Sequence, residues 1–129
     1  MQPCEQARLA RRLLDRGYAA PITIKQLSHE VALSPFHLIR LFRRTYRQTP
    51  HQYLIQVRIA RAKELLSQSD RSITEICADV GFESLGSFSA LFRKSTGISP
   101  SAYRRSSQSA RKAAYIPLCI CLSHDLPDP

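Results

Sequence analysis

Basic side chains are the groups of this chain best suited to chemistry, because each can pair with a negative charge of a polyanion. The chain has 19 lysine and arginine residues against 10 aspartate and glutamate residues, a formal net charge of +9 over 129 residues. From Arg40 to Lys63 there are several basic residues and no acidic one. This balance favours a polyanionic partner such as nucleic acid, although a ribosomal or membrane-surface protein would show the same excess.

Histidine and cysteine lack the spacing that catalysis or metal binding requires. Neither a ligand pattern such as HExxH nor a glycine-rich phosphate loop is formed, and no serine or cysteine nucleophile has a partner in sequence. Cys119 and Cys121 are separated by one residue, which leaves open a metal or redox pair. Cys77 is expected to be a small buried residue. We therefore predict no enzyme, no cofactor and no metal site. The four histidines form no ligand spacing: His29, His37, His51 and His124. Of these, His37 and His51 are interpreted as surface polar residues or at most phosphate contacts.

The sequence contains one unit twice. The stretch from Ser34 to Tyr53 is SPFHLIRLFRRTYRQTPHQY, and the stretch from Ser84 to Tyr103 is SLGSFSALFRKSTGISPSAY. The residues just before each stretch repeat as well, with a shift of one residue in the connecting turn. Two copies of one unit predict two equivalent structural modules. Apolar, basic and proline positions coincide in pairs: Leu38 with Phe88, Leu41-Phe42 with Leu91-Phe92, Arg43-Arg44 with Arg93-Lys94, and Pro50 with Pro100.

Each unit has the periodicity of two short helices. In the first unit a short apolar face is followed by Ser34, which suits a helix cap, and Pro35, which suits the first helical position. Two helices joined by a tight turn, the second with a basic outward stripe, are typical of a helix-turn-helix, whose second helix enters the DNA major groove. Steps of three and four divide this second helix into an inward face with Leu38, Leu41, Phe42 and Thr45, and an outward face with Phe36, Ile39, Arg40, Arg43 and Arg47.

The remaining pattern predicts an all-α fold of about seven helices, with two helix-turn-helix units joined by a long linking helix. At 1.5 Å per residue, nineteen residues of linking helix reach roughly 28 Å. This length is close to the ~34 Å pitch of B-DNA, so the helix could hold the units one turn apart. Its expected apolar positions are Tyr53, Leu54, Val57, Ala60, Leu65 and Leu66. The expected elements are a helix at about 4–17, a first unit at about 24–46, the linking helix at about 50–68, a second unit at about 73–96, and a short helix from Pro100.

The two ends of the chain are expected to contribute little. No apolar run approaches the ~18–20 residues of a membrane span, and the N-terminus lacks the apolar core of a signal peptide, which predicts a cytoplasmic protein with no membrane partner. We expect one domain over residues 1–106. Residues 107–129 contain a short apolar patch and several prolines, and we interpret them as a disordered tail.

These motifs resemble the DNA-binding domain of the AraC/XylS family of transcription regulators. The resemblance covers nearly the whole chain and rests on LSPFHLIRLFRR, TPHQYLIQVRIARAKELL, SITEICADVGFES and FSALFRKSTGISPSAYRR, at residues 33–44, 49–66, 72–84 and 88–105. It implies two helix-turn-helix units, binding to promoter DNA, and activation through contact with RNA polymerase. Few residues precede the first expected helix, so the chain resembles the stand-alone, MarA/SoxS-like members, with no small-molecule effector site evident. A truncated or degenerate copy of a longer member is the alternative.

The resemblance also places the DNA contacts. In the first unit it implies base-facing positions at Phe36, Ile39 and Arg40; arginine can pair with guanine, and phenylalanine can pack on a thymine methyl. Ile39 departs from the polar residue often found there, and a packing role is equally compatible with it. In the second unit, small or apolar residues predict poor base readout at Leu85, Gly86, Ser89 and Ala90. The residues suited to phosphate contacts are Arg43, Arg44, Arg93 and Lys94.

Two functions of different classes follow. The first is sequence-specific DNA binding for transcription regulation. The second is a protein-interaction module that binds another regulator or RNA polymerase and tolerates a weak second recognition helix; the run Leu85-Gly86-Ser87 favours this second function.

Overall fold

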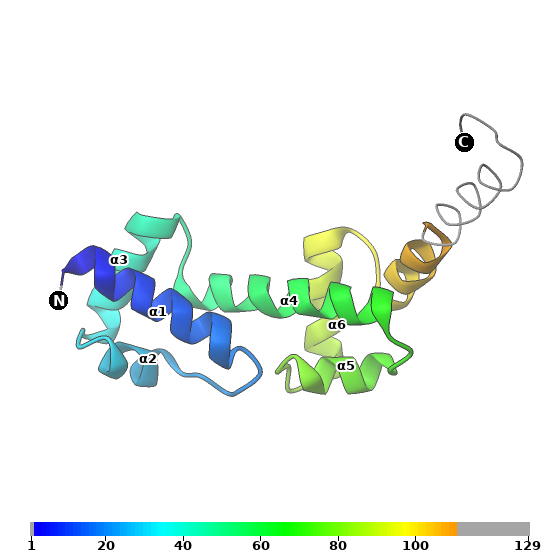
Figure 1. Cartoon of the computed structure of the whole chain (residues 1–129), viewed down its shortest axis with the longest axis horizontal. Helices are drawn as coiled ribbons and strands as arrows, with labels where there is room; N and C mark the ends of the chain where they lie inside the picture. Colours follow the sequence, from blue (N-terminus) through cyan, green and yellow to red (C-terminus); the bar gives the residue numbers. More distant parts are fainter. Residues whose placement is uncertain (1, 111–129) are drawn as a thin grey trace, which may run out of the picture.

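The computed structural model describes residues 2–110, which form helices and no strand. The helices are α1 (Pro3–Gly17), α2 (Ile24–Glu30), α3 (Pro35–Tyr46), α4 (Pro50–Gln68), α5 (Ile73–Asp79) and α6 (Leu85–Thr96), followed by helical residues 100–110 (Figure 1). The predicted all-α class, with two helix-turn-helix units joined by a long helix, is confirmed. No helix within residues 2–110 is both long and apolar enough to cross a membrane.

Hydroxyl caps start the helices of both units. The side chains of Thr23, Ser34, Thr49, Ser72 and Ser84 each accept a hydrogen bond from a backbone N–H three residues further on, at 3.1–3.2 Å. Such caps satisfy N–H groups that have no partner inside the helix, and each typically contributes about 1 kcal/mol. Because such caps are local, the sequence predicted the one at Ser34 correctly.

The molecule is extended, with one lobe at each end of α4 (Figure 1). The first lobe consists of α1, α2 and α3 around a core with Leu14, Leu38 and Phe42. The second consists of α5, α6 and the helix of residues 100–110, around a core with Phe88 and Phe92. Tyr53 and Tyr103 close the two cores in equivalent ways: their rings lie 5.7 Å from Phe42 and 5.4 Å from Phe92, centroid to centroid.

Helix α4 contributes to both cores, but with different faces. Leu54 packs in the first lobe, whereas Ile59, Ala62 and Leu66 pack in the second. The prediction that Ala60 lies among the apolar core positions of this helix is wrong, because this residue is exposed. A helix that serves two cores on different sides does not follow a single 3.6-residue stripe, so the periodicity of one face mispredicts its middle.

The last helix continues past Ser106, the expected end of the domain. Residues 107–110 are helical, and the hydroxyl of Ser107 hydrogen-bonds that of Ser67 on α4. From the same helix, the guanidinium of Arg104 donates to the carbonyls of Leu66 and Ser69 at 3.2 and 3.3 Å, at the C-terminal end of α4. A cation is favourable there, because the last carbonyls of a helix carry partial negative charge. The helix thus includes residues 107–110 of the expected tail, and the remainder of that tail, with Cys119 and Cys121, lies outside the described residues.

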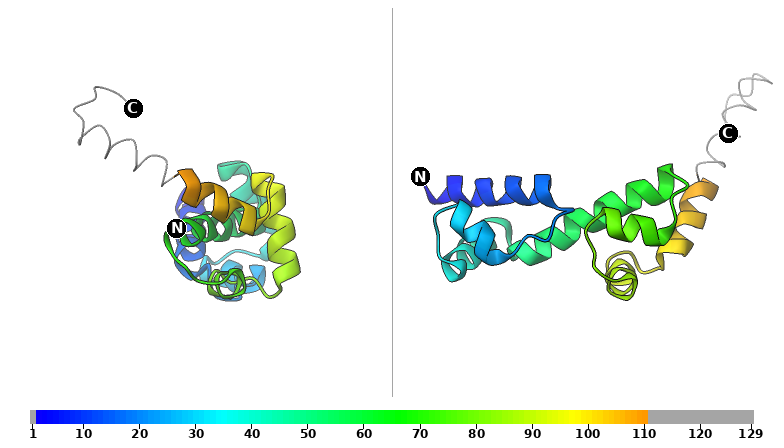
Figure 2. Two further views of the ribbon diagram at one scale, coloured as in Figure 1. Left: turned by 90° about the vertical axis from the view of Figure 1, so that its right-hand side faces the viewer. Right: turned by 90° about the horizontal axis from the view of Figure 1, so that it is seen from below.

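Figure 2 shows that α3 and α6 lie on the same side of α4, whereas α1 lies on the opposite side. The two second helices of the repeated units therefore face in a common direction from the two ends of one rigid helix. This arrangement follows from the repeat: equivalent lobes packed against one helix present equivalent faces.

Arg47 has a left-handed backbone, with φ 64° and ψ 18°, directly after α3. The equivalent residue after α6 is Gly97, with φ 89°. Left-handed conformations favour glycine, because a Cβ crowds the neighbouring carbonyl oxygen. The end of α3 is thus strained at Arg47, and the second lobe avoids the same strain with Gly97.

Replacing Arg47 with glycine should raise the free energy of unfolding by about 0.5–1 kcal/mol. Glycine relieves the backbone strain, and the greater conformational entropy of the unfolded chain offsets only part of that gain. Chemical denaturation measures the change. Arg47→Ala is the matched control, because it removes the same charge and keeps the Cβ, and it should leave stability nearly unchanged. An equal gain from both variants would show that charge repulsion, and not backbone strain, is relieved.

Candidate nucleic-acid interface

The outward face of α3 presents Phe36 and Arg40. Phe36 is 69% exposed, which is unusual for a phenylalanine on a helix whose opposite face is fully buried. The Arg40 guanidinium carbon lies 5.6 Å from the centroid of the Phe36 ring. The two side chains therefore form one exposed apolar and cationic pair. An aromatic ring beside a guanidinium can contact a thymine methyl and a guanine edge, respectively.

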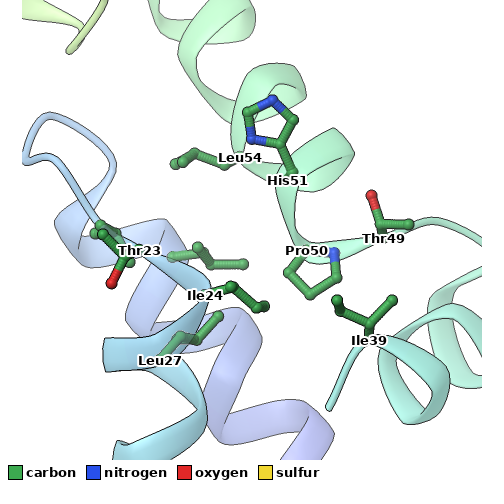
Figure 3. A pocket seen from close by; sticks show the side chains of 10 residues that line it. Thr23, Ile24, Leu27, Ile39, Thr49, Pro50, His51 and Leu54 are labelled. Atoms are coloured by element: carbon green, nitrogen blue, oxygen red, sulfur yellow. The ribbon is translucent and has the colours of Figure 1, made fainter. Parts of the chain in front are cut away.

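Ile39 lies differently from these two neighbours. It is half-buried and lines a cavity of about 500 Å³ together with Ile24, Leu27, Pro50 and Leu54 (Figure 3). The lining is largely aliphatic and comes from the three helices of the first lobe and from the start of α4. This placement favours the packing role for Ile39 that the sequence left open alongside a base contact.

Ile39→Ala should therefore lower stability by about 1–2 kcal/mol, less than for a fully buried isoleucine, and leave base preference unchanged. Denaturant unfolding and a base-preference profile measure the two effects. Phe36→Ala is the control: its side chain is mostly exposed, so its loss should change stability by less than about 0.5 kcal/mol. A relaxed preference at one base pair in Ile39→Ala, without loss of stability, would contradict the packing role.

The corresponding face of α6 carries little that could read a base. Leu85 is 43% exposed, Gly86 and Ala90 are exposed, and Ser89 is half-buried. A Cβ on Gly86 would meet no atom within 4 Å, so the surface there is open. Only Ser89 has a polar side chain at these positions, and one hydroxyl reads bases poorly because it can donate or accept.

The basic residues expected at phosphates are all exposed, and none of them pairs with a carboxylate in the part of the chain that the structure describes. Arg43 and Arg44 lie in the last turns of α3, and Arg93 and Lys94 in those of α6. Among residues 2–110, the ion pairs are instead made by Arg11, Arg61 and Arg71. Cations without a carboxylate nearby remain available to an external anion. The two clusters are related by the repeat, so each lobe offers its own pair of charges.

Arg58 is the arginine whose role the sequence did not reveal. Its Nε donates to the carbonyl of Tyr18 at 2.7 Å, and its Nη2 donates to the carbonyl of Ala20 at 3.0 Å. The guanidinium carbon lies 5.6 Å from the Phe82 ring centroid. Burial lowers the pKa of Arg58, and the carboxylate of Glu83 opposes that shift. The side chain stays charged, since a guanidinium remains protonated in proteins, and it lies where the two lobes meet.

Cys77 is buried, as the sequence predicted. Its Sγ lies 3.5 Å from the carbonyl oxygen of Ser84, and burial raises the pKa of this thiol. A buried thiol with a raised pKa is chemically inert, so Cys77 contributes packing beneath the start of α6.

Comparison with known proteins agrees with this architecture. Residues 27–106 match a family model described as a helix-turn-helix domain. The raffinose operon transcriptional regulatory protein RafR of Pediococcus pentosaceus is 36% identical over 102 residues, which are 79% of this chain and 37% of that protein. The melibiose operon regulatory protein of Escherichia coli K12 is 35% identical over 96 residues, or 74% of this chain and 32% of that protein. The chain thus spans about a third of the length of these relatives.

A solved structure extends the likeness to a protein bound to DNA. The DNA-binding domain of the global transcriptional factor AdpA, in complex with a target DNA, is 29% identical, with a TM-score of 0.77 over 83% of this chain and 96% of that domain. The family model and these relatives agree with the repeated units and the shared linking helix of the fold. The chain therefore belongs to the AraC/XylS family of transcription regulators, whose AraC-type DNA-binding domain it contains.

Proposed function

We propose that this protein is a sequence-specific regulator of transcription that places α3 and α6 in two successive major grooves on one face of the duplex. The observation that carries the proposal is the common orientation of α3 and α6 at the two ends of α4 (Figure 2). Helix α4 has 19 residues, and its length of roughly 28 Å is comparable with the ~34 Å helical pitch of B-DNA. The two half-sites are then about one turn apart and form no palindrome, because both units belong to one chain.

The two recognition helices contribute unequally in this proposal. Arg40 pairs with a guanine and Phe36 packs on a thymine methyl, so the first half-site carries most of the sequence information. Helix α6 presents Leu85, Gly86 and Ala90, and binds mainly through phosphate contacts at Arg93 and Lys94. Phosphate contacts set the register of the protein on the duplex without reading its sequence.

The regulatory part of the proposal rests on the relatives. Two of them are operon regulatory proteins by name. We propose that this protein likewise acts at promoters, as an activator that contacts RNA polymerase once it is bound beside the polymerase site.

DNA binding should depend strongly on salt, since each phosphate contact releases a counterion. The slope of log K against log salt concentration should be several units for the wild type. Single alanine variants of Arg43, Arg44, Arg93 and Lys94 should each weaken binding on all sequences and reduce that slope by about one. Fluorescence anisotropy over a salt series measures both quantities.

Arg71→Ala is the matched control for these variants. Arg71 is partly exposed but pairs with Asp79 at 2.7 Å on α5, so its loss should leave the salt slope unchanged. A wild-type slope near zero would contradict DNA binding by this surface. A slope that falls equally in Arg71→Ala would show that net charge, and not the named contacts, determines affinity.

A protein-interaction module is the second candidate function. The exposed apolar side chains of Leu85 and Ile98 favour it, because exposed apolar surface often marks a protein contact. On this alternative, the domain binds another regulator or RNA polymerase and binds DNA weakly. A gel shift at moderate salt, with and without competitor DNA, separates the two functions: only the first retains a specific complex in the presence of competitor.

A further inference from the structure

We propose that Arg58 acts as a clamp between the two lobes and thereby determines which spacing of half-sites the protein accepts. This inference rests on the proposed two-groove mode of binding. Arg58 is a positioning residue in this proposal: it contacts no DNA and acts through the orientation of α3 relative to α6.

Three parts of the chain meet at the guanidinium of Arg58. It extends from the middle of α4, and both of its hydrogen bonds end on the α1–α2 connector of the first lobe, at Tyr18 and Ala20. Its carbon lies over the ring of Phe82, in the turn of the second lobe. One side chain therefore joins the linking helix, the first lobe and the second lobe. Because the acceptors are backbone carbonyls, the contact restricts the path of the connector itself.

Close approach of the backbones shows that the lobes are pressed together here. A Cβ built on Gly81 would lie 2.7 Å from the carbonyl oxygen of Tyr18 and 2.9 Å from Nε of Arg58. The equivalent turn of the first lobe has Ala32 instead, also with a positive φ of 60°, and Ala32 is exposed. A Cβ is thus accommodated where no neighbouring lobe approaches. Contact with the first lobe, in addition to turn geometry, therefore requires glycine at position 81.

Side-chain packing at the same place joins the two cores. Tyr18 packs against the core of the first lobe and also against that of the second. Besides α4, the lobes meet through this tyrosine, the Arg58 contacts and the close approach of Gly81 to Tyr18 and Ala19. Loss of the arginine removes two hydrogen bonds and a cation–π contact from this junction. We expect the second lobe to become freer to swing relative to the first.

Freedom at this junction has a specific consequence for binding. When one lobe is bound, a rigid junction holds the other lobe close to a half-site at the matching distance, so its effective concentration there is high. At a half-site with any other spacing, the effective concentration of that lobe is low. A loose junction spreads that concentration over several spacings. Arg58 variants should therefore lose discrimination between spacings, and their affinity for a single half-site should not change.

The test uses Arg58→Met, which keeps the apolar stem, and Arg58→Lys, which keeps the charge but lacks the forked donors. Lys63→Met is the matched control, because it removes one charge from the same helix at a residue without an ion pair among residues 2–110. The DNA probes are a duplex selected from random sequence by the wild type, the same duplex with one to three base pairs added or removed between half-sites, and a version with the second half-site scrambled.

Wild type and Lys63→Met should prefer one spacing by roughly tenfold or more, as expected for a matched, rigid linkage. Arg58→Met and Arg58→Lys should show roughly a threefold preference or less, with unchanged affinity for the scrambled probe. A spacing profile identical to the wild type in both variants would overturn the clamp. An equal loss on every probe would also overturn it, since that result indicates a general loss of folding or charge.

A readout without DNA distinguishes failure of the clamp from failure of the proposed function. Spin labels at positions 25 and 74, which are exposed and equivalent in α2 and α5, report the distance between lobes in a variant with its four cysteines replaced. The wild type should give one narrow distribution and Arg58→Met a broad one. Wild-type protein that selects no DNA sequence would refute the proposed function, and the distance distribution would still decide whether Arg58 holds the lobes together.

Discussion

Gly81→Ala should lower the free energy of unfolding by about 3 kcal/mol. Two costs add. The backbone of Gly81 has φ 100°, which costs about 1 kcal/mol or more for an alanine. Its Cβ would also lie 2.7 Å from a backbone oxygen and 3.1 Å from the Cα of Ala19, and forced contacts of this kind typically cost about 1–3 kcal/mol. Denaturant unfolding measures the loss.

Gly97→Ala is the matched control for this prediction. Gly97 has a similar φ of 89°, but a Cβ there would meet no atom within 4 Å. Its replacement should therefore lower the free energy of unfolding by about 1 kcal/mol, which is the cost of the positive φ alone. The difference between the two variants isolates the contact between lobes. Equal losses of stability in the two variants would mean that the first lobe moves away from the added methyl group at no free-energy cost. That result would contradict a rigid junction.

Arg40→Ala should weaken binding to the preferred DNA by about 1–3 kcal/mol, or roughly 5- to 150-fold, and relax the preference at one base pair of the first half-site. The physical reason is the loss of two parallel hydrogen bonds to a guanine edge. Arg40 is exposed and contacts the equally exposed Phe36 ring, so stability should change little. Sequencing of DNA selected from random pools gives the base-by-base profile.

Gly86→Ala serves as the counterpart in the second unit. Gly86 lies in the first turn of α6 with open space around it, so alanine should raise stability by up to about 1 kcal/mol and leave base preference almost unchanged. An unchanged profile in Arg40→Ala, or a second half-site more selective than the first, would contradict the unequal roles assigned to α3 and α6.

Local signals account for the parts of the fold that the sequence predicted well. Hydroxyl caps such as Ser34 and Ser72 bond to N–H groups three residues away, so their effect depends on nearby sequence alone. Likewise Leu38 and Phe88 point inward because their own short helices each have a single apolar face. The repeat then implied that both units fold alike, and it predicted that α3 and α6 are the helices that face DNA.

Contacts between elements that are far apart in the sequence could not be predicted from such local signals. Helix α4 turns Leu54 to one core and Ile59 to the other, and no single periodicity describes both. Ile39 fits the outward stripe of α3 by spacing, yet it lines a cavity formed with α2 and α4. The helix at 107–110 is held by Ser67, about forty residues earlier in the chain, a contact that no local pattern encodes.

By itself, the sequence determined the helices, their caps, the duplication and the exposed charges of α3 and α6, because hydrogen bonding and amphipathic periodicity act within a few residues. Only the tertiary structure decided how the two units lie relative to one another. That arrangement depends on Arg58 reaching the carbonyls of Tyr18 and Ala20 and on Gly81 admitting the first lobe. These residues are distant in sequence, and the physical reason for their identity is contact with the backbone of residues 18–20, which exists only in the folded chain.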